Sequence, residues 1–266
     1  MDFDPWLRQW QLVADGDPIV THSSRLLLVR RGETAAMLKI AAEPDEIFGG
    51  SVMEWWDGDG AAKVFARAGH ALLLERAEGS RSLLEMALAG EDDEASRIMC
   101  RVADRLHAPR DKPLPDLVPL PHWFRALEPA ADRYGGLFPR SAAIARDLLA
   151  MPQEVCVLHG DIHHENVLDF GTRGWLAIDP KGLLGERGFD YANILCNPEL
   201  KTVISPGRFL RQLGVVAEAA RLERQRLLRW VIAYAGLSAA WFLDDGMAAD
   251  SDLAVMEMAL AELEGS

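Results

Sequence analysis

The sequence predicts an α+β fold in two lobes, a β-rich N-terminal lobe that carries one helix and a mostly helical C-terminal lobe. Two observations support this. Short apolar runs separated by turn residues fill the first part of the chain, and apolar residues recur at helical spacing after Gly79. We place the boundary in the connection from Glu75 to Gly79, which gives lobes of residues 1–78 and 79–266.

The N-terminal lobe is expected to be a small sheet carrying one helix, with an antiparallel meander over residues 10–40. The turn residues Asp15-Gly16-Asp17 and Arg31-Gly32-Glu33 separate the first three runs. A helix follows from Pro44 to Trp56. The expected strands are residues 10–13, 25–29, 35–40, 62–65 and 71–75.

The C-terminal lobe should begin with helices over 81–90 and 92–107, followed by a proline-rich surface connection over 109–121. A helix is expected over 141–151. Short, hairpin-like strands should follow at 155–158, 167–169 and 175–178, and the chain from 206 onward reads as helical, with breaks near Gly214 and Gly246.

Composition restricts the class of protein. A net charge of -13 argues against nucleic acid as a partner and suits a cationic substrate, although acidity is also common in soluble cytosolic proteins. We find no apolar run long enough for a membrane span and no secretory signal, so a cytoplasmic location is expected. No sequence pattern indicates an oligomer, and we expect a monomer. Cys100, Cys156 and Cys196 read as buried free thiols.

The segment His159-Gly160-Asp161-Ile162-His163-His164-Glu165-Asn166 carries the chemistry. Asp161 and Asn166 have the H-x-D-x-x-x-x-N spacing of a kinase catalytic loop, and Asp179 ends a short strand just downstream. Asp161 can accept a proton from an attacking hydroxyl group, whereas Asn166 and Asp179 offer the oxygen ligands that Mg²⁺ prefers. The pattern therefore indicates ATP-dependent phosphoryl transfer.

Other interpretations remain open at this point. One is a zinc hydrolase, in which His159, His163 and His164 bind the metal ion and Asp161 supports them. Another is a kinase-like binding module without activity. The presence of Lys39, Asp161, Asn166 and Asp179 argues against such a silent module.

Lys39 ends the third apolar run, where a lysine can reach the phosphates of ATP and be held by a glutamate of the following helix. Glu46 and Glu54 are both candidates for that glutamate. No glycine-rich loop stands between the first two long strands. The polar run Thr21-His22-Ser23-Ser24 takes its place and could cradle phosphate.

These motifs resemble the aminoglycoside phosphotransferases, which have a two-lobed protein-kinase-like fold. They are most similar to the streptomycin 6-kinase group, which includes hydroxyurea-resistance kinases. The similarity covers nearly the whole chain, and the double-histidine loop distinguishes this group. The matching stretches are 21–24, 55–58, 158–168, 174–180, 182–186 and 236–241.

The resemblance implies a role for each matched position. Asp161 would be the catalytic base, His163 a donor to the γ-phosphate, and Asp190 a brace that accepts N–H groups of the catalytic loop. ATP and Mg²⁺ would be the cofactors. Lys39 with Glu46, Ser23, Ser24, and the hinge residues Glu75 and Ala77 would bind ATP, and Asn166 and Asp179 would hold Mg²⁺.

The expected acceptor is streptomycin, phosphorylated at the 6-hydroxyl of its streptidine ring, because its two guanidinium groups pair well with carboxylates. Asp244, Asp245 and Glu186 are the candidate acceptor-binding residues. A sugar or cyclitol kinase is the alternative on the same fold. Lys181, beside the expected metal site, departs from the neutral residue or histidine expected in close relatives, and its role stays open.

Overall fold

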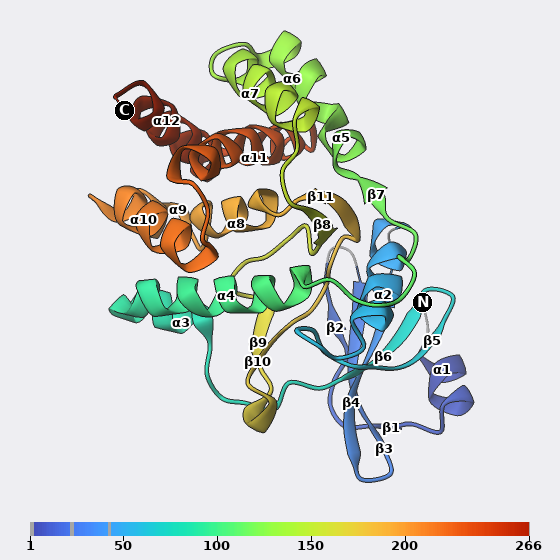
Figure 1. Ribbon diagram of the computed structural model, residues 1–266. Helices are drawn as coiled ribbons and strands as arrows, with labels where there is room; N and C mark the ends of the chain where they lie inside the picture. Colours follow the sequence, from blue (N-terminus) through green and yellow to red (C-terminus); the bar gives the residue numbers. More distant parts are fainter. Residues whose placement is uncertain (1–2, 22–23, 42–43, 266) are drawn as a thin grey trace.

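The computed structural model describes residues 3–21, 24–41 and 44–265. The N-terminal part is an antiparallel sheet in the order β1-β3-β4-β6-β5, with β2 paired to the same edge of β3 as β1 (Figure 1). The expected meander is present in β1, β3 and β4, whereas β6 lies between β4 and β5 in the rest of the sheet. Its strands are β1 (Val13–Ala14), β2 (Ile19–Val20), β3 (Ser24–Arg31), β4 (Thr34–Ala41), β5 (Val64–Ala68) and β6 (Ala71–Glu75).

Of the strand expected over 10–13, only Val13 lies in a strand, β1. Helix α1 (Asp4–Gln9) ends there instead, with Pro5 in its first turn. Trp6 and Trp10 are four residues apart, which places both rings on one helical face, 5.4 Å apart between centroids. They pack against the apolar side of β3 and β4, so tertiary burial outweighs the β propensity of the run.

Helix α2 (Pro44–Trp56) matches its expected bounds and ties the sheet to the helical part. The indole N–H of Trp56 donates to the carbonyl of Leu106 over 3.1 Å, and that of Trp55 donates to the carbonyl of Pro113 over 2.8 Å. A side chain at Gly49 would collide with the carbonyl of Pro180, so glycine lets α2 approach the segment beside the catalytic strands.

The helical part agrees with the sequence over 92–107 and in outline over 141–151. The helix α10 (Arg208–Ala220) runs through Gly214 without the expected break, and Arg221, which caps its end, has φ 53°. Its helices are α3 (Leu83–Met86), a π-helical segment Ala87–Glu91, α4 (Asp92–His107), α5 (Leu120–Trp123), a 3-10 turn Phe124–Ala126, α6 (Leu127–Tyr134), α7 (Phe138–Ala150), α8 (Gly188–Leu195), α9 (Leu200–Val203), α10 (Arg208–Ala220), α11 (Arg224–Asp244) and α12 (Asp250–Gly265).

Two small sheets lie between these layers. β9 (Val167–Asp169) and β10 (Trp175–Ala177) form the expected hairpin, with a 3-10 turn Gly171–Arg173 between them. β8 (Val155–Leu158) instead pairs with β11 (Leu183–Glu186), which also pairs in parallel with β7 (Val118–Pro119). Ala177 exchanges backbone hydrogen bonds with the 60–62 segment, so the hairpin sits at the junction with the N-terminal sheet.

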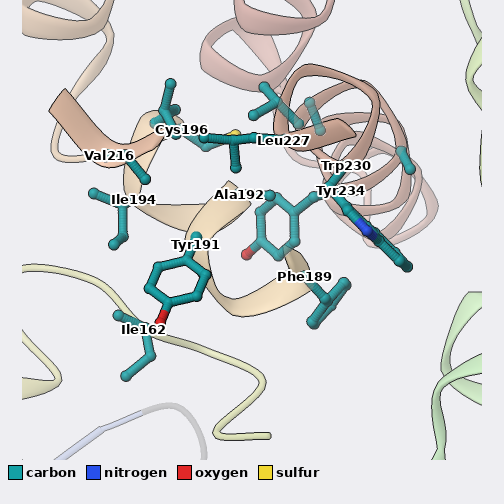
Figure 2. Close-up of a cluster of buried hydrophobic side chains, with 14 of the residues drawn as sticks. Ile162, Phe189, Tyr191, Ala192, Ile194, Cys196, Val216, Leu227, Trp230 and Tyr234 are labelled. Carbon is teal, nitrogen blue, oxygen red and sulfur yellow. The ribbon is translucent and has the colours of Figure 1, made fainter. Parts of the chain in front are cut away.

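The main core surrounds α11, whose apolar residues are buried on nearly every side by α7, α8 and α12. Figure 2 shows Phe189, Tyr191 and Ala192 of α8 filling the space between α11 and the loop residue Ile162. By length and composition α11 is apolar enough to cross a membrane, but 72% of its apolar window is buried inside the protein. We therefore interpret α11 as the central core helix.

Candidate active site

The catalytic loop, residues 159–166, joins β8 to β9, and the side chain of Asp190 on α8 binds its backbone. The two Asp190 carboxylate oxygens accept the backbone N–H groups of His159 (2.9 Å) and Gly160 (2.7 Å). His107 Nε2 lies 2.8 Å from the same carboxylate. Burial raises the pKa of Asp190, but His107, His159 and the Gly160 N–H outweigh burial, so the net pKa is lowered. The loop therefore rests on a buried carboxylate held in its charged form.

His159 is a structural member of the loop. Its Nε2 donates to the carbonyl of Ile178 over 2.7 Å, and its Nδ1 accepts the N–H of Asp161 over 3.1 Å. The ring is fully buried and stacks on Trp56, and burial lowers its pKa. Both ring nitrogens of the neutral imidazole are thus occupied, which leaves none to bind a metal ion.

The structure does not support the zinc alternative. His164 is also buried, and burial lowers its pKa to about 4. Within the described ranges, no three His, Cys, Asp or Glu side chains converge as a metal site.

Asp161 is surrounded by donors. Asn193 Nδ2 lies 3.1 Å from Oδ1, while Asn166 Nδ2 and Lys181 Nζ lie 3.3 and 3.7 Å from Oδ2. His163 Nε2 is 3.9 Å from Oδ1. These neighbours fix the rotamer of a partly exposed carboxylate that can receive a proton from a bound hydroxyl group.

The expected phosphate and metal residues come together beside Asp161. Lys39 Nζ, on β4, donates to Asp179 Oδ1 over 2.7 Å. The Asn166 carbonyl accepts the N–H of Ile178, which places Asn166 and Asp179 on neighbouring segments. Asn166 uses its Nδ2 to hold Asp161, so its Oδ1, together with the second oxygen of Asp179, is chemically suited to Mg²⁺.

The remaining residues expected to bind the nucleotide give a mixed result. Glu54 pairs with Arg67 over 2.7 Å, which removes it as the partner of Lys39. The Glu46 side chain and the whole of Ser23 lie outside the described part of the structure. Ser24 is buried, and its hydroxyl bonds Thr21 over 3.0 Å. Ser24 therefore closes the turn in this structure, and its role toward phosphate stays a prediction.

At the expected hinge, Glu75 ends β6. Its carboxylate accepts hydrogen bonds from Arg173 and from the N–H of Lys63 (3.1 Å). Ala77 packs at the edge of an apolar cluster that includes Leu168 and Ile178. Hydrogen bonds thus fix the end of β6, and half-buried apolar side chains lie beside it. Such a surface is suited to binding a flat aromatic ring such as adenine.

A cavity of about 600 Å³ opens on the other side of Asp161. The catalytic loop and Lys181 form one end, and the other walls come from α5 and the turn after it, α8, α11 and the start of α12. Its aromatic lining is Trp123, Tyr234, Trp241 and Phe242; its charged or titratable lining is Arg125, Asp161, His163, Lys181, Asp245 and Asp252. A cavity of this size at the catalytic loop is the natural place for the acceptor.

Only one of the three expected acceptor carboxylates lines this cavity. Asp245 does so. Asp244 instead binds Arg133 (2.7 Å) and Tyr134 (2.9 Å) outside it. Glu186 was a wrong choice, because it is 2% exposed and binds Trp230 Nε1, the N–H of Gln153 and the guanidinium of Arg226.

Sequence reasoning missed Asn193, His107 and Asp252. Asn193 follows Asp190 by three residues on α8, which puts both side chains on the face toward the loop, and that spacing was a usable signal. His107 and Asp252 meet the site only through tertiary packing, and no local pattern marks them.

Comparison with known proteins now decides the family. The model for aminoglycoside/hydroxyurea antibiotic resistance kinases matches residues 9–246. The chain belongs to this family. It is therefore a phosphotransferase that uses an alcohol group as acceptor. This excludes the alternative of a kinase-like binding module without activity.

Two curated relatives and one solved structure illustrate the similarity. Streptomycin 3''-kinase of Klebsiella pneumoniae is 55% identical, over 95% of this chain and 98% of its own. Streptomycin 6-kinase of Streptomyces griseus is 28% identical, over 96% and 85%. A mutant of aminoglycoside phosphotransferase APH(4)-Ia, in complex with ADP and hygromycin B, is 12% identical with a TM-score of 0.66, over 98% of this chain and 96% of that one. The protein-kinase-like α+β fold is confirmed.

Proposed function

We propose that this kinase transfers the γ-phosphoryl group of ATP to a hydroxyl group of streptomycin and thereby confers resistance to it. The main support is the position of Asp161, which borders both the Lys39–Asp179 pair and the cavity lined by aromatic and acidic side chains. A cytoplasmic site of action fits the need for ATP.

In the proposed reaction, Asp161 accepts the proton of the acceptor hydroxyl as that oxygen bonds to the γ-phosphorus. The bond from phosphorus to the leaving oxygen of ADP breaks in the same step, which gives ADP and the phosphate ester. Asn193 and Asn166 aim the Asp161 carboxylate. Such positioning is the larger part of catalysis of phosphoryl transfer by proteins.

The charge of the nucleotide would be met from several elements. Lys39 reaches the phosphates from β4, and Asn166 and Asp179 would hold Mg²⁺, which would offset phosphate charge when bound. His163 accepts the N–H of Glu165 at Nδ1 over 3.2 Å, so the neutral ring carries its proton on Nε2, toward Asp161. His163 and Lys181 are thus our candidates to donate to the transferred phosphoryl group.

The hydroxyl that is modified is the point on which the relatives differ. The 55% identity to a streptomycin 3''-kinase, against 28% for a 6-kinase, favours the 3''-hydroxyl over the 6-hydroxyl implied by the motifs. Both products have the same mass, so two-dimensional ¹H–³¹P NMR of purified phosphostreptomycin is the experiment that distinguishes them.

The proposal is tested by coupled ADP-release assays with streptomycin, hygromycin B, a neutral aminoglycoside analogue and a free cyclitol. Asp161→Asn is the matched control, and we expect a fall in kcat of about 10²–10⁴-fold with ATP binding retained. Transfer to the cyclitol but not to streptomycin would favour the metabolite-kinase alternative. Near-normal turnover by Asp161→Asn would remove Asp161 from the role of base.

A further inference from the structure

Asp252 lies in the first turn of α12 and lines the acceptor cavity, although only 5% of the residue is exposed. Its carboxylate is hydrogen-bonded by Ser238 of α11 and by its own backbone N–H. The side chain is therefore held in place by short-range contacts, with the cavity in front of it.

Asp252 differs from the other buried carboxylates of the described chain in one respect. The others each have a cationic side chain or a histidine as partner: Asp92 has Arg208, Asp169 has Arg81, Glu186 has Arg226 and Asp190 has His107. Among the described residues, Asp252 makes no ion pair.

An unpaired buried carboxylate is costly unless a cation meets it. Burial raises the pKa of Asp252 to about 6, against the opposing hydrogen bonds from Ser238 and the backbone. The aromatic side chains of Tyr234, Trp241 and Phe242 line the same cavity, and aromatic faces attract guanidinium and ammonium groups. The chemistry of the cavity thus matches a cation supplied by a ligand.

Tyr234 links this position to the catalytic base. Burial first, and then the negative charges of Asp161 and Asp252, raise the pKa of Tyr234 well above its usual value. Tyr234, Asp161 and Asp252 all line the same cavity, so one acceptor can contact the two carboxylates and the Tyr234 ring together.

We propose that Asp252 determines specificity for cationic acceptors by binding a guanidinium or ammonium group while Asp161 receives the proton of the reacting hydroxyl. This inference rests on the proposed function, and it names a carboxylate that sequence reasoning did not consider.

Acceptor binding should then release a proton from Asp252, because a bound cation favours the carboxylate over the acid. Wild-type affinity should rise with pH through about 6. Other titratable or charged groups in the cavity or close to Asp252 also affect how acceptor affinity changes with pH, and they do so equally in wild type and in the variants. From the packed elements these are Tyr234 and Asp245 of the α11 segment and Cys196 after α8, with Asp161, His163, Lys181 and Arg125 elsewhere in the cavity.

The test compares wild type, Asp252→Asn and Asp244→Asn, which removes an acidic charge outside the cavity. Thermal shifts are recorded with streptidine, a cyclitol with two guanidinium groups, and with neutral myo-inositol. Streptidine should raise the Tm of wild type and Asp244→Asn more than myo-inositol does. Asp252→Asn should lose this difference and, without ligand, melt at or above the wild-type temperature, since an unpaired buried charge has been removed.

Kinetics provide the second measurement. Asp252→Asn should raise KM for streptomycin by about 10–100-fold with kcat little changed, and its KM should no longer fall through about pH 6. Equal streptidine shifts in wild type and Asp252→Asn, or none in either, would overturn the inference. If streptidine binds through Asp252 but wild type phosphorylates no aminoglycoside, the proposed function fails while the Asp252 site stands.

Discussion

Asp190 is the residue of the site whose side chain binds the backbone of the catalytic loop. It receives the N–H groups of His159 and Gly160 as well as the His107 ring. A carboxylate can serve three donors because both of its oxygens are acceptors only. An amide offers one acceptor atom and adds donors of its own, so asparagine is not a neutral replacement here.

We therefore expect Asp190→Asn to lower the free energy of unfolding by about 1–3 kcal/mol at pH 7, because buried donors lose their partner. Since the folded pKa of Asp190 is lowered, the stability it contributes is full above the unfolded pKa, about 4, and is lost as pH falls through the folded pKa. Urea unfolding at several pH values should show the wild-type advantage shrinking below about pH 4.

Asp244→Asn is the matched control for this measurement. It removes the acidic partner of Arg133 at the surface, where ion pairs contribute little, so its effect should be much smaller. An Asp190→Asn protein that is as stable as wild type at pH 7 would show that the loop N–H groups find other acceptors.

At the scale of elements, α11 sets the geometry of the acceptor cavity because it packs directly on α7 and α8. The Ser141 hydroxyl of α7 donates to the carbonyl of Ile232 over 2.8 Å, in a buried contact. A Cβ at Gly236 would lie 2.7 Å from the Cβ of Ser141 and would also meet its hydroxyl. Glycine at 236 is thus required by the close approach of two helices rather than by a turn.

Gly236→Ala should destabilise the protein by about 1–3 kcal/mol, since an added methyl group forces the two helices apart. Gly214→Ala is the opposite case. Gly214 lies in the interior of α10, and no atom would lie within 4 Å of its Cβ, so alanine should stabilise by about 0.5–1 kcal/mol. Urea denaturation of the two variants tests both signs, and equal effects would contradict the packing argument.

The sequence was a good guide wherever the signal is local. Alternating apolar residues gave β3, β4 and β6, and motif spacing located Asp161, Asn166 and Asp179. Which carboxylates acquire partners could not be predicted, because the partners are distant in the chain. Glu186 meets Arg226 forty positions away, and Asp92 meets Arg208 at a separation of 116. Asp252 is informative for the reverse reason, because no cationic side chain in the described part of the chain pairs with it.

At the scale of the whole molecule, the N-terminal sheet and the helical part meet at the β9–β10 hairpin. Arg173 of the turn binds Glu75 at the end of β6, and Asp169 binds Arg81 just after the hinge over 2.8 Å. Lys39 reaches Asp179 across the same junction. These ion pairs hold the two halves of the nucleotide site in register, so nucleotide binding should be sensitive to a change on either side.

Lys39→Met is the sharpest test of this arrangement. Methionine matches the buried stem of the lysine, and the partly exposed Asp179 carboxylate can be solvated, so the protein should fold with little change in Tm. The loss of a charged donor to phosphate should weaken ATP binding by about 10–100-fold in calorimetric titrations. Lys63→Met, which removes an exposed lysine near β5, should leave ATP affinity unchanged. Equal ATP affinities for wild type and Lys39→Met would mean that Lys39 does not bind the phosphates, and that other groups hold them.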